Sequence, residues 1–208
     1  MVTAPAIAPE AATAVGLHAF VIASVGGQGG LLATRVLADV LLRAGDQVKT
    51  SEVHGMAQRG GSVLSFIRSG KDYFTPVIDP GTADALLGLE LLETVRALPY
   101  LRAKGVVVAN TDLVMPVPVI TGQSKMPTDL VDRLRRAAGR LVLVPAGEIA
   151  VHLGSARVAN VVCLGALAAC AGIDEALWRA AIAAAVPPRT VDLNLTAFAE
   201  GLAAARQA

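Results

Sequence analysis

The first third of the chain changes from a continuous apolar run to a helical spacing of apolar residues across one glycine-rich turn. Residues 18–25, HAFVIASV, are rich in β-branched side chains and bounded by glycine, which predicts a buried strand. GGQGG follows at once, and apolar residues then recur every three or four positions over 31–45, as in an amphipathic helix. The pattern therefore predicts a strand, a glycine turn and a helix.

Short apolar runs and helical patterns then alternate along the chain. Strands are expected at 47–53, 62–69, 83–90, 105–111 and 140–146, and helices at 91–101 and 127–139. From about residue 147 the pattern is helical and rich in alanine, with breaks at Gly172 and at Pro187-Pro188. The alternation predicts a single domain over residues 17–208: a three-layer α/β/α sandwich with a mostly parallel, Rossmann-like sheet and a helical C-terminal part.

Composition and charge narrow the class of protein. The first sixteen residues are rich in Ala and Pro and lack the positive segment of a signal peptide, so we expect a disordered leader and a cytoplasmic protein. The longest charge-free apolar run, 158–173, is shorter than the roughly twenty residues of a membrane span. A formal charge of +1, with no basic run interleaved with aromatics, indicates no nucleic-acid partner.

The two cysteines, Cys163 and Cys170, stand seven apart in a helical pattern, where they share one helix face as small apolar residues. Two such thiols cannot hold an iron-sulfur cluster alone. The sequence contains neither CxxC nor HExxH, and its three histidines are scattered. We therefore expect no metal site in this chain.

Glycines at a strand-to-helix turn let the backbone approach a phosphate, whose charge the start of the helix favours. The turn consists of Gly26, Gly27, Gln28, Gly29 and Gly30. A dinucleotide fingerprint would also need glycine at position 24, where Ser24 stands. Two interpretations stay open: a site for a phosphate or nucleotide-like ligand, and tight strand-helix packing or a subunit contact.

Residues 51–63, SEVHGMAQRGGSV, gather polar chemistry in a chain that is otherwise mostly aliphatic. Glu52, His54, Gln58 and Arg59 precede Gly60 and a second glycine, and a loop buried in a core would not carry them. Polar groups on positioned loops usually serve function, so we expect a binding site or subunit contact, with a chance grouping of solvated residues as the alternative. No complete catalytic set is present, and the catalytic residues stay unassigned.

Other candidates stand where expected strands and helices end or begin. Glu90 and Asn110 lie at the carboxyl ends of two expected strands, where open α/β sheets bind ligands. Helix capping and turn formation are the alternative interpretation. Arg157 and Asn160 are expected at the start of a helix or in an interface, with a ligand contact as the alternative.

Residues 25–68, VGGQGGLLATRVLADVLLRAGDQVKTSEVHGMAQRGGSVLSFIR, resemble the gamma-type domain of the 2-oxoacid:acceptor oxidoreductases. The likeness continues through ADALLGLELLETVRALPYLRAKGVVVANT, RVANVVCLGAL and DLNLTAFAEG, and covers about residues 19–202. EVHGMAQRGGSV is similar to the indolepyruvate branch of the family. Pyruvate-type members more often carry Tyr-Gly-Pro-Glu before Arg-Gly-Gly, so the departure favours an aromatic 2-oxoacid.

The resemblance implies a subunit of an enzyme of the EC 1.2.7 type, which uses thiamine diphosphate, Mg and iron-sulfur clusters. Such an enzyme decarboxylates an aryl-pyruvate such as indolepyruvate, forms the acyl-CoA and reduces ferredoxin. The chain shows no thiamine-diphosphate Gly-Asp-Gly segment followed by a metal-binding Asn, and its cysteines cannot ligate clusters. The cofactors, and the contact with ferredoxin, are therefore expected on a larger partner subunit.

The resemblance further implies that this chain is inactive alone, completes the active cleft with residues 52–61 and helps to hold the co-substrate CoA. Its high apolar content also suggests a homodimer or a heteromer with that partner. Two alternatives remain: a free-standing oxidoreductase that binds a nucleotide or flavin at the glycine turn, and a purely structural assembly subunit.

Overall fold

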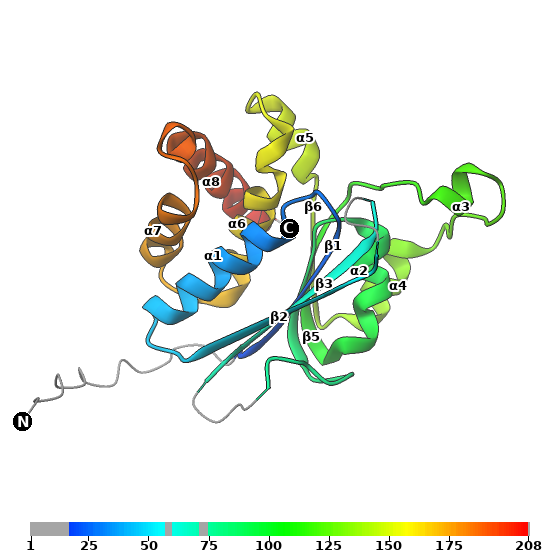
Figure 1. Cartoon of the computed structure of the whole chain (residues 1–208), viewed down its shortest axis with the longest axis horizontal. Helices are drawn as coiled ribbons and strands as arrows, with labels where there is room; N and C mark the ends of the chain where they lie inside the picture. The colour runs from blue at the N-terminus through cyan, green and yellow to red at the C-terminus, as the bar shows by residue number, and fades with distance from the viewer. Residues whose placement is uncertain (1–16, 57–59, 71–74, 208) are drawn as a thin grey trace, which may run out of the picture.

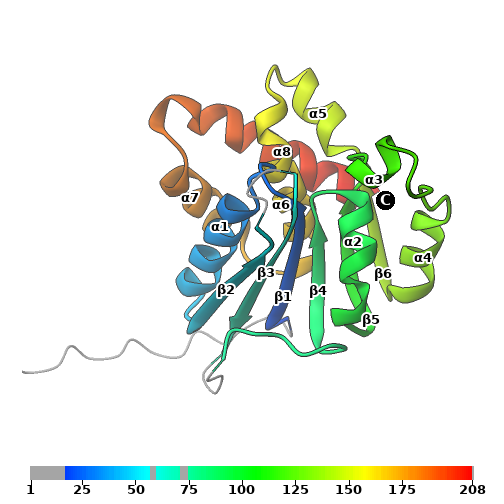
Figure 2. The same ribbon diagram turned by 45° about the vertical axis from the view of Figure 1, so that its right-hand side comes forward.

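A computed structural model describes residues 17–56, 60–70 and 75–207, which form one six-stranded sheet between two layers of helices (Figure 1). The strands are β1 (Ala19–Val25), β2 (Val48–His54), β3 (Ser62–Ser69), β4 (Ala83–Gly88), β5 (Leu101–Asn110) and β6 (Arg140–Val144). Their order is β2-β3-β1-β4-β5-β6 (Figure 2). Only β3, antiparallel to β1 and β2, runs against the others. The predicted mostly parallel α/β fold is confirmed.

Helices cover both faces of this sheet (Figure 1). One face carries α1 (Gly30–Arg43), α5 (Ala146–His152), α6 (Ala159–Ala171), α7 (Glu175–Ala185) and α8 (Val191–Gln207). The other carries α2 (Leu91–Ala97) and α4 (Leu130–Ala137), and a short helix, α3 (Val117–Ile120), stands on the arm between β5 and α4. The described residues also form three single 3-10 turns, which are η1 (Leu98–Tyr100), η2 (Ala156–Val158) and η3 (Pro188–Thr190).

Successive side chains of β1 point into two separate cores, one on each face of the sheet. Phe20 and Ile22 pack with α1 and α6, whereas Val21 and Ala23 pack toward α2 and α4. A strand buried on both faces carries a continuous apolar run instead of an alternating one, which explains HAFVIASV. The glycine turn at the end of β1 is thereby held by the most buried strand of the sheet.

The apolar run 158–173 forms α6, which is buried on almost every side in the core. It packs against α8, where a side chain on Gly165 would overlap the backbone carbonyl of Phe198. Among the described residues no helix has both the length and the apolar character to cross a membrane. The expected leader, residues 1–16, lies outside the described residues.

The one clear error in the expected elements concerns residues 98–104. The helix expected over 91–101 ends at Ala97, because Pro99 lacks the N–H that a continuing helix needs, and η1 follows. Strand β5 then begins at Leu101, four residues before the expected start. Leu101 pairs with Ala83, and a shift of register follows before the regular pairing resumes.

Candidate functional site

The glycine turn between β1 and α1 adopts backbone conformations that favour glycine. Gly27 has φ +104° and Gly29 has φ +81°, both in the left-handed region. The side-chain Oε1 of Gln28 accepts a hydrogen bond from the backbone N–H of Val25 at 2.8 Å, which closes the turn. A Cβ added to Gly27 would meet no atom of the described residues within 4 Å, so this part of the turn is open.

The other glycines of the turn are packed against side chains. Asn160 Nδ2 donates a hydrogen bond to the carbonyl oxygen of Gly29 at 3.1 Å, and a Cβ on Gly29 would overlap this amide. A Cβ on Gly30 would lie 2.6 Å from Ser24 Oγ. The two interpretations of the turn are therefore compatible: Gly29 and Gly30 serve close packing, while Gly27 leaves room for a ligand.

Helix α1 begins directly after this turn without a side-chain cap. Its N-cap is Gly29, its first turn contains no acidic residue, and the first hydrogen bond of the helix runs from Ala33 N–H to the carbonyl of Gly29. The N–H groups of an uncapped first turn carry a partial positive charge and favour an anion.

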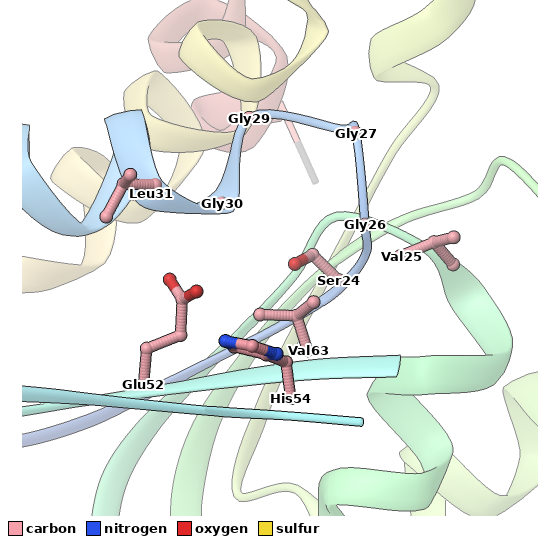
Figure 3. A pocket seen from close by; sticks show the side chains of 10 residues that line it. All are labelled: Ser24, Val25, Gly26, Gly27, Gly29, Gly30, Leu31, Glu52, His54 and Val63. Carbon is pink, nitrogen blue, oxygen red and sulfur yellow. The ribbon is translucent and has the colours of Figure 1, made fainter. Parts of the chain in front are cut away.

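We call the first of two pockets beside the turn the hairpin pocket. It measures about 430 Å³ and lies between the glycine turn and strands β2 and β3. Its lining residues are Ser24, Val25, Gly26, Gly27, Gly29, Gly30, Leu31, Glu52, His54 and Val63. Figure 3 shows the side chains of Glu52 and His54 projecting from β2 toward the turn. Residues two apart on a strand share one face, so both predicted side chains reach the same pocket.

Among the described residues, Glu52 and His54 have few partners. Ser65 Oγ lies 3.5 Å from Glu52 Oε2, at the outer limit of a hydrogen bond, and His54 Nδ1 lies 3.0 Å from the carbonyl oxygen of Gly55. Both side chains are exposed. They are therefore available to a ligand or to another chain.

The polar segment 51–63 and the glycine turn, separate motifs in the sequence, are joined by backbone hydrogen bonds. Gly60 N–H donates to the carbonyl of Gly26 at 3.1 Å, and Gly26 N–H donates to the carbonyl of Gly61 at 2.8 Å. The end of the segment thus closes over the start of the turn. Gln58 and Arg59, the remaining candidates of the segment, lie outside the described residues.

Glu90 lies at the start of α2 and caps this helix. Its Oε2 accepts from Glu93 N–H at 2.7 Å, and its Oε1 accepts from Val114 N–H at 2.9 Å. The residue is 1% exposed, and burial raises the pKa of its carboxyl above the ordinary value although these backbone donors oppose the change. With both oxygens engaged, the contacts favour the capping interpretation over ligand binding.

Asn110 joins three segments at the carboxyl end of β5. Its Nδ2 donates to the carbonyl of Leu89 at 3.0 Å, while its Oδ1 accepts from the N–H groups of Asp112 at 3.2 Å and Ala146 at 3.1 Å. The side chain is buried. These contacts favour the turn-forming interpretation of Asn110.

A second pocket, the switch-point pocket, measures about 530 Å³ and lies at the carboxyl ends of β1, β4 and β5. Strand β1 leads to α1 on one face of the sheet and β4 leads to α2 on the other, and ligands of open α/β sheets bind at such a reversal. The lining residues of the switch-point pocket are Gly27, Gln28, Gly29, Leu32, Leu89, Asn110, Asp112, Ala156, Arg157, Ala159, Asn160 and Cys163. Asp112 was not among the candidates from the sequence, although it follows β5 as Glu90 follows β4.

The described part of the chain holds no group of three or more His, Cys, Asp or Glu residues placed to bind a metal ion. Cys163 is buried in α6, and burial, together with the negative charge of Asp112, raises the pKa of its thiol. Burial also raises the pKa of the Cys170 thiol, against the opposing charge of Arg140. Neither thiol is disposed to form the thiolate that metals and electrophiles need.

The chain is similar to proteins of one family over nearly its whole length. Residues 19–204 match the family model described as pyruvate ferredoxin/flavodoxin oxidoreductase. Indolepyruvate oxidoreductase subunit IorB of Thermococcus kodakarensis is 37% identical over 194 residues, which cover 90% of this chain and 95% of the relative. The subunit IorB of Archaeoglobus fulgidus is 38% identical over 185 residues, covering 87% and 92%.

Solved structures agree with these sequence comparisons. The gamma subunit of a keto/oxoacid ferredoxin oxidoreductase from Geobacter sulfurreducens has a TM-score of 0.70 and 26% identity, with 92% of this chain and 99% of that chain covered. The fold also matches 31% of a 2-oxoglutarate:ferredoxin oxidoreductase chain from Magnetococcus marinus, with a TM-score of 0.70 and 18% identity. The resemblance seen in the sequence is confirmed, and the chain belongs to the pyruvate ferredoxin/flavodoxin oxidoreductase family as a domain of the gamma type.

Proposed function

We propose that this chain is the cofactor-free small subunit of an enzyme that oxidatively decarboxylates an aryl-pyruvate such as indolepyruvate to the acyl-CoA and passes the electrons to ferredoxin. Thiamine diphosphate with Mg and the iron-sulfur clusters would lie on a larger partner subunit, where they supply the carbon-carbon cleavage and the one-electron transfer. Similarity to IorB subunits, over 90% and 87% of this chain for two of them, supports the substrate class. The small chain would complete the active cleft and hold CoA.

The observation that carries this proposal is the convergence of two motifs on the hairpin pocket. The glycine turn and the uncapped start of α1 favour a phosphate group, while Glu52 and His54 project into the same space. The described residues of this pocket contain no nucleophile with a partnered base, so positioning and electrostatics are the roles that remain. The phosphates of CoA match the anion preference of the glycine turn and of the start of α1.

An exposed apolar arm supports assembly with a partner. Between β5 and α4, the residues Leu113, Val114, Met115, Val117 and Ile120 are each between 42% and 70% exposed. Figure 1 shows this arm, with α3, standing away from the sheet. Contiguous aliphatic side chains of this size are typical of protein contact surfaces, so we propose that the arm packs against another subunit.

The experiment for CoA uses the enzyme reconstituted from both subunits and compares Gly27→Val with Gly45→Val. Both glycines are exposed, have positive φ and have no atom within 4 Å of an added Cβ, so the backbone strain is matched. Only Gly27 lines the pockets beside the turn. We expect Gly27→Val alone to raise the KM for CoA, and equal KM values in the two folded variants would show that the turn is merely structural.

The polar segment 51–63 is tested with His54→Ala, Arg59→Ala and Arg59→Lys in the same complex. Lysine keeps the charge of Arg59 but not its bidentate geometry, so an anion contact predicts more damage from alanine than from lysine. Turnover at saturating partner is measured separately from the affinity for the partner. Lost turnover in an intact complex supports a place at the cleft, and weaker association with normal turnover supports an interface. No change in either would refute a functional segment.

The proposal also predicts that the purified chain is colourless and binds neither thiamine diphosphate nor an iron-sulfur cluster. Visible absorbance of a flavin or a cluster in the isolated chain would instead favour the free-standing oxidoreductase. A purely structural subunit would give a third result. The chain would associate with the larger subunit, but no variant in either motif would change turnover or CoA kinetics.

A further inference from the structure

A third hollow, which we call the arm groove, lies on the other face of the sheet, between α2, α4 and the arm that joins β5 to α4 (Figure 2). It measures about 380 Å³. Its walls are largely apolar, and the arm and both helices contribute to them: Leu92, Val95, Pro118, Val119, Met126 and Leu130. A groove with such walls can take the apolar side chains of a bound protein segment.

The charged side chains that line the arm groove in the described structure are all cations: Arg96, Lys125 and Arg133. Arg96 forms an ion pair with Glu93, and Arg133 Nε donates to Asp129 at 2.9 Å. A guanidinium has five N–H donors, so both arginines keep donors for a further carboxylate. Lys125 is exposed and forms no ion pair with any described residue. The rim of the groove therefore favours acidic groups.

Positive charge extends beyond the groove into the surrounding part of the chain. Residues 91–140 hold eight of the eighteen Lys and Arg residues but only four of the seventeen Asp and Glu residues. The remainder of the chain is therefore net negative. An acidic surface is attracted to the part of the chain that carries the arm groove and is repelled by the rest.

Two exposed side chains beside the groove favour a protein segment over a small acid. Val117 and Ile120 lie on α3 and are 70% and 69% exposed. Neither lines the groove, whereas Pro118 and Val119 between them do. A small molecule inside the groove would leave Val117 and Ile120 in water, but a protein segment that crosses the rim covers them as well. Contiguous apolar surface of this kind is typical of protein contacts.

We propose that the arm groove binds an acidic, amphipathic segment of the larger partner subunit. Apolar side chains of that segment enter the groove, and its carboxylates pair with Arg96, Lys125 and Arg133 at the rim. The identity of the partner rests on the proposed function, whereas the chemistry of the segment follows from the groove. No described residue lines both the arm groove and a pocket beside the glycine turn, so changes in the groove should leave CoA binding intact.

The charged rim is tested with Lys125→Glu, and Lys104→Glu is the matched control. Lys104 is also exposed, also lies within residues 91–140 and forms no ion pair with any described residue, but it does not line the groove. Equilibrium binding of the full chain to the larger subunit is measured at low salt. We expect Lys125→Glu to weaken it about tenfold and Lys104→Glu by less than about threefold. At about 0.5 M salt the difference should shrink, because the charges are screened.

The apolar part of the groove is tested with Ser124→Trp, and Gln123→Trp is the matched control. These neighbours are both exposed on the arm, but only Ser124 lines the groove. An indole ring at position 124 fills space that the partner segment needs, so we expect binding to the larger subunit to weaken about tenfold. Gln123→Trp should bind like the unaltered chain. Unchanged melting temperatures of all four variants verify the fold.

Three results would overturn this inference. The first is equal affinity within the glutamate pair, and the second is equal affinity within the tryptophan pair. The third is binding of phenylacetate to the free chain that is lost in Lys125→Glu while association with the larger subunit is unaltered, because the groove would then hold a small acid.

Kinetics of the reconstituted complex separate the docking groove from the proposed role in holding CoA. If Gly27→Val raises the KM for CoA while every groove variant associates normally, the proposed function stands and this inference fails. If Lys125→Glu and Ser124→Trp weaken association while Gly27→Val leaves CoA kinetics unchanged, the docking groove stands and the role in holding CoA fails.

Discussion

The two pockets beside the glycine turn are built in opposite ways. Every described lining residue of the hairpin pocket lies between Ser24 and Val63, and its candidate polar groups, Glu52 and His54, are exposed on an edge strand. The switch-point pocket draws its lining from Gly27 to Cys163 and includes the buried amides of Asn110 and Asn160. One pocket is made by neighbouring motifs, and the other is made by the tertiary fold.

This difference separates side chains that hold the fold from side chains that are free to serve a ligand. The amides of the switch-point pocket tie distant segments together, so their removal affects stability as well as any bound molecule. Glu52 and His54 of the hairpin pocket make few contacts with the part of the chain that the structure describes. Substitutions on the two sides of the turn should therefore separate stability from function.

The largest effect is expected for Gly29→Val. The φ of +81° costs a non-glycine residue about 1–2 kcal/mol, and the added side chain would also overlap the amide of Asn160, an overpacking that costs about 1–3 kcal/mol. Gly27→Val carries the first cost only, because its Cβ points into open space. Urea unfolding should therefore show a loss about 2 kcal/mol greater at Gly29 than at Gly27. Equal losses would contradict the described packing of the turn.

A double-mutant cycle tests the contact between Gly29 and Asn160 directly, with a smaller expected change in the free energy of unfolding. Asn160→Ala removes both the hydrogen bond to Gly29 and the atoms that a Cβ at this position would overlap. We expect Gly29→Ala to cost about 1 kcal/mol less in the Asn160→Ala background than in the unaltered chain. Strict additivity of the two unfolding free energies would show that the turn and α6 are not coupled through this contact.

Much of the fold follows from local pattern. The apolar run of β1, the glycines after it and the helical spacing of α1 are each recorded in consecutive residues, and the two motifs of the hairpin pocket are close in sequence. The error at residues 98–104 shows the limit, since the end of α2 depends on Pro99 and the start of β5 on pairing with Ala83. The contact of Asn160 with Gly29 joins residues 131 positions apart, and no local period encodes it.

The candidate site, like the fold, was predictable where its residues are close in sequence and not where they are distant. Glu52 and His54 were singled out by their polar surroundings, and the structure brings them to one pocket with the glycine turn. The switch-point pocket was not foreseen as a unit, because Asp112, Arg157 and Asn160 meet there only through the order of the strands and the position of α6. The functions of Gln58 and Arg59 stay predictions from the sequence.

A pH-dependent effect on stability is expected for Glu90→Gln, at the start of α2. An amide has one acceptor oxygen where the carboxyl group has two, so the substitution should cost about 1 kcal/mol at acidic pH. The raised pKa means that the folded chain holds the Glu90 proton more tightly than the unfolded chain. The stability from this group is therefore fully present below the ordinary value of 4.5 and is lost as pH rises through the pKa of the folded state.

The measurement is the free energy of unfolding in urea for both proteins at several pH values, from about 4 to 7. The cost of Glu90→Gln should decrease as pH rises, because only the carboxyl group pays the desolvation of its charged form. A cost that grows with pH would mean that the backbone donors outweigh burial and that the pKa of Glu90 is lowered instead.

The smallest effect on stability is expected on the hairpin side, for Glu52→Gln and His54→Ala. Both side chains are exposed, and the contact of Glu52 with Ser65, at 3.5 Å, is too long to contribute much. Each variant should change the free energy of unfolding by less than about 0.5 kcal/mol. Thr50→Ser is the matched control, since Thr50 is exposed on the same face of β2 but does not line the hairpin pocket.

The same variants of β2 that barely change stability should have a large effect on function. If Glu52 and His54 serve a ligand or a partner, their variants lose turnover or association in the reconstituted enzyme, while Thr50→Ser retains both. Because Glu52 and His54 are exposed and contribute little to stability, loss of function in these variants could not be explained by unfolding. A stability loss above about 1 kcal/mol in either variant would instead show that these residues hold the edge strand in place, and the contrast between the two pockets would then disappear.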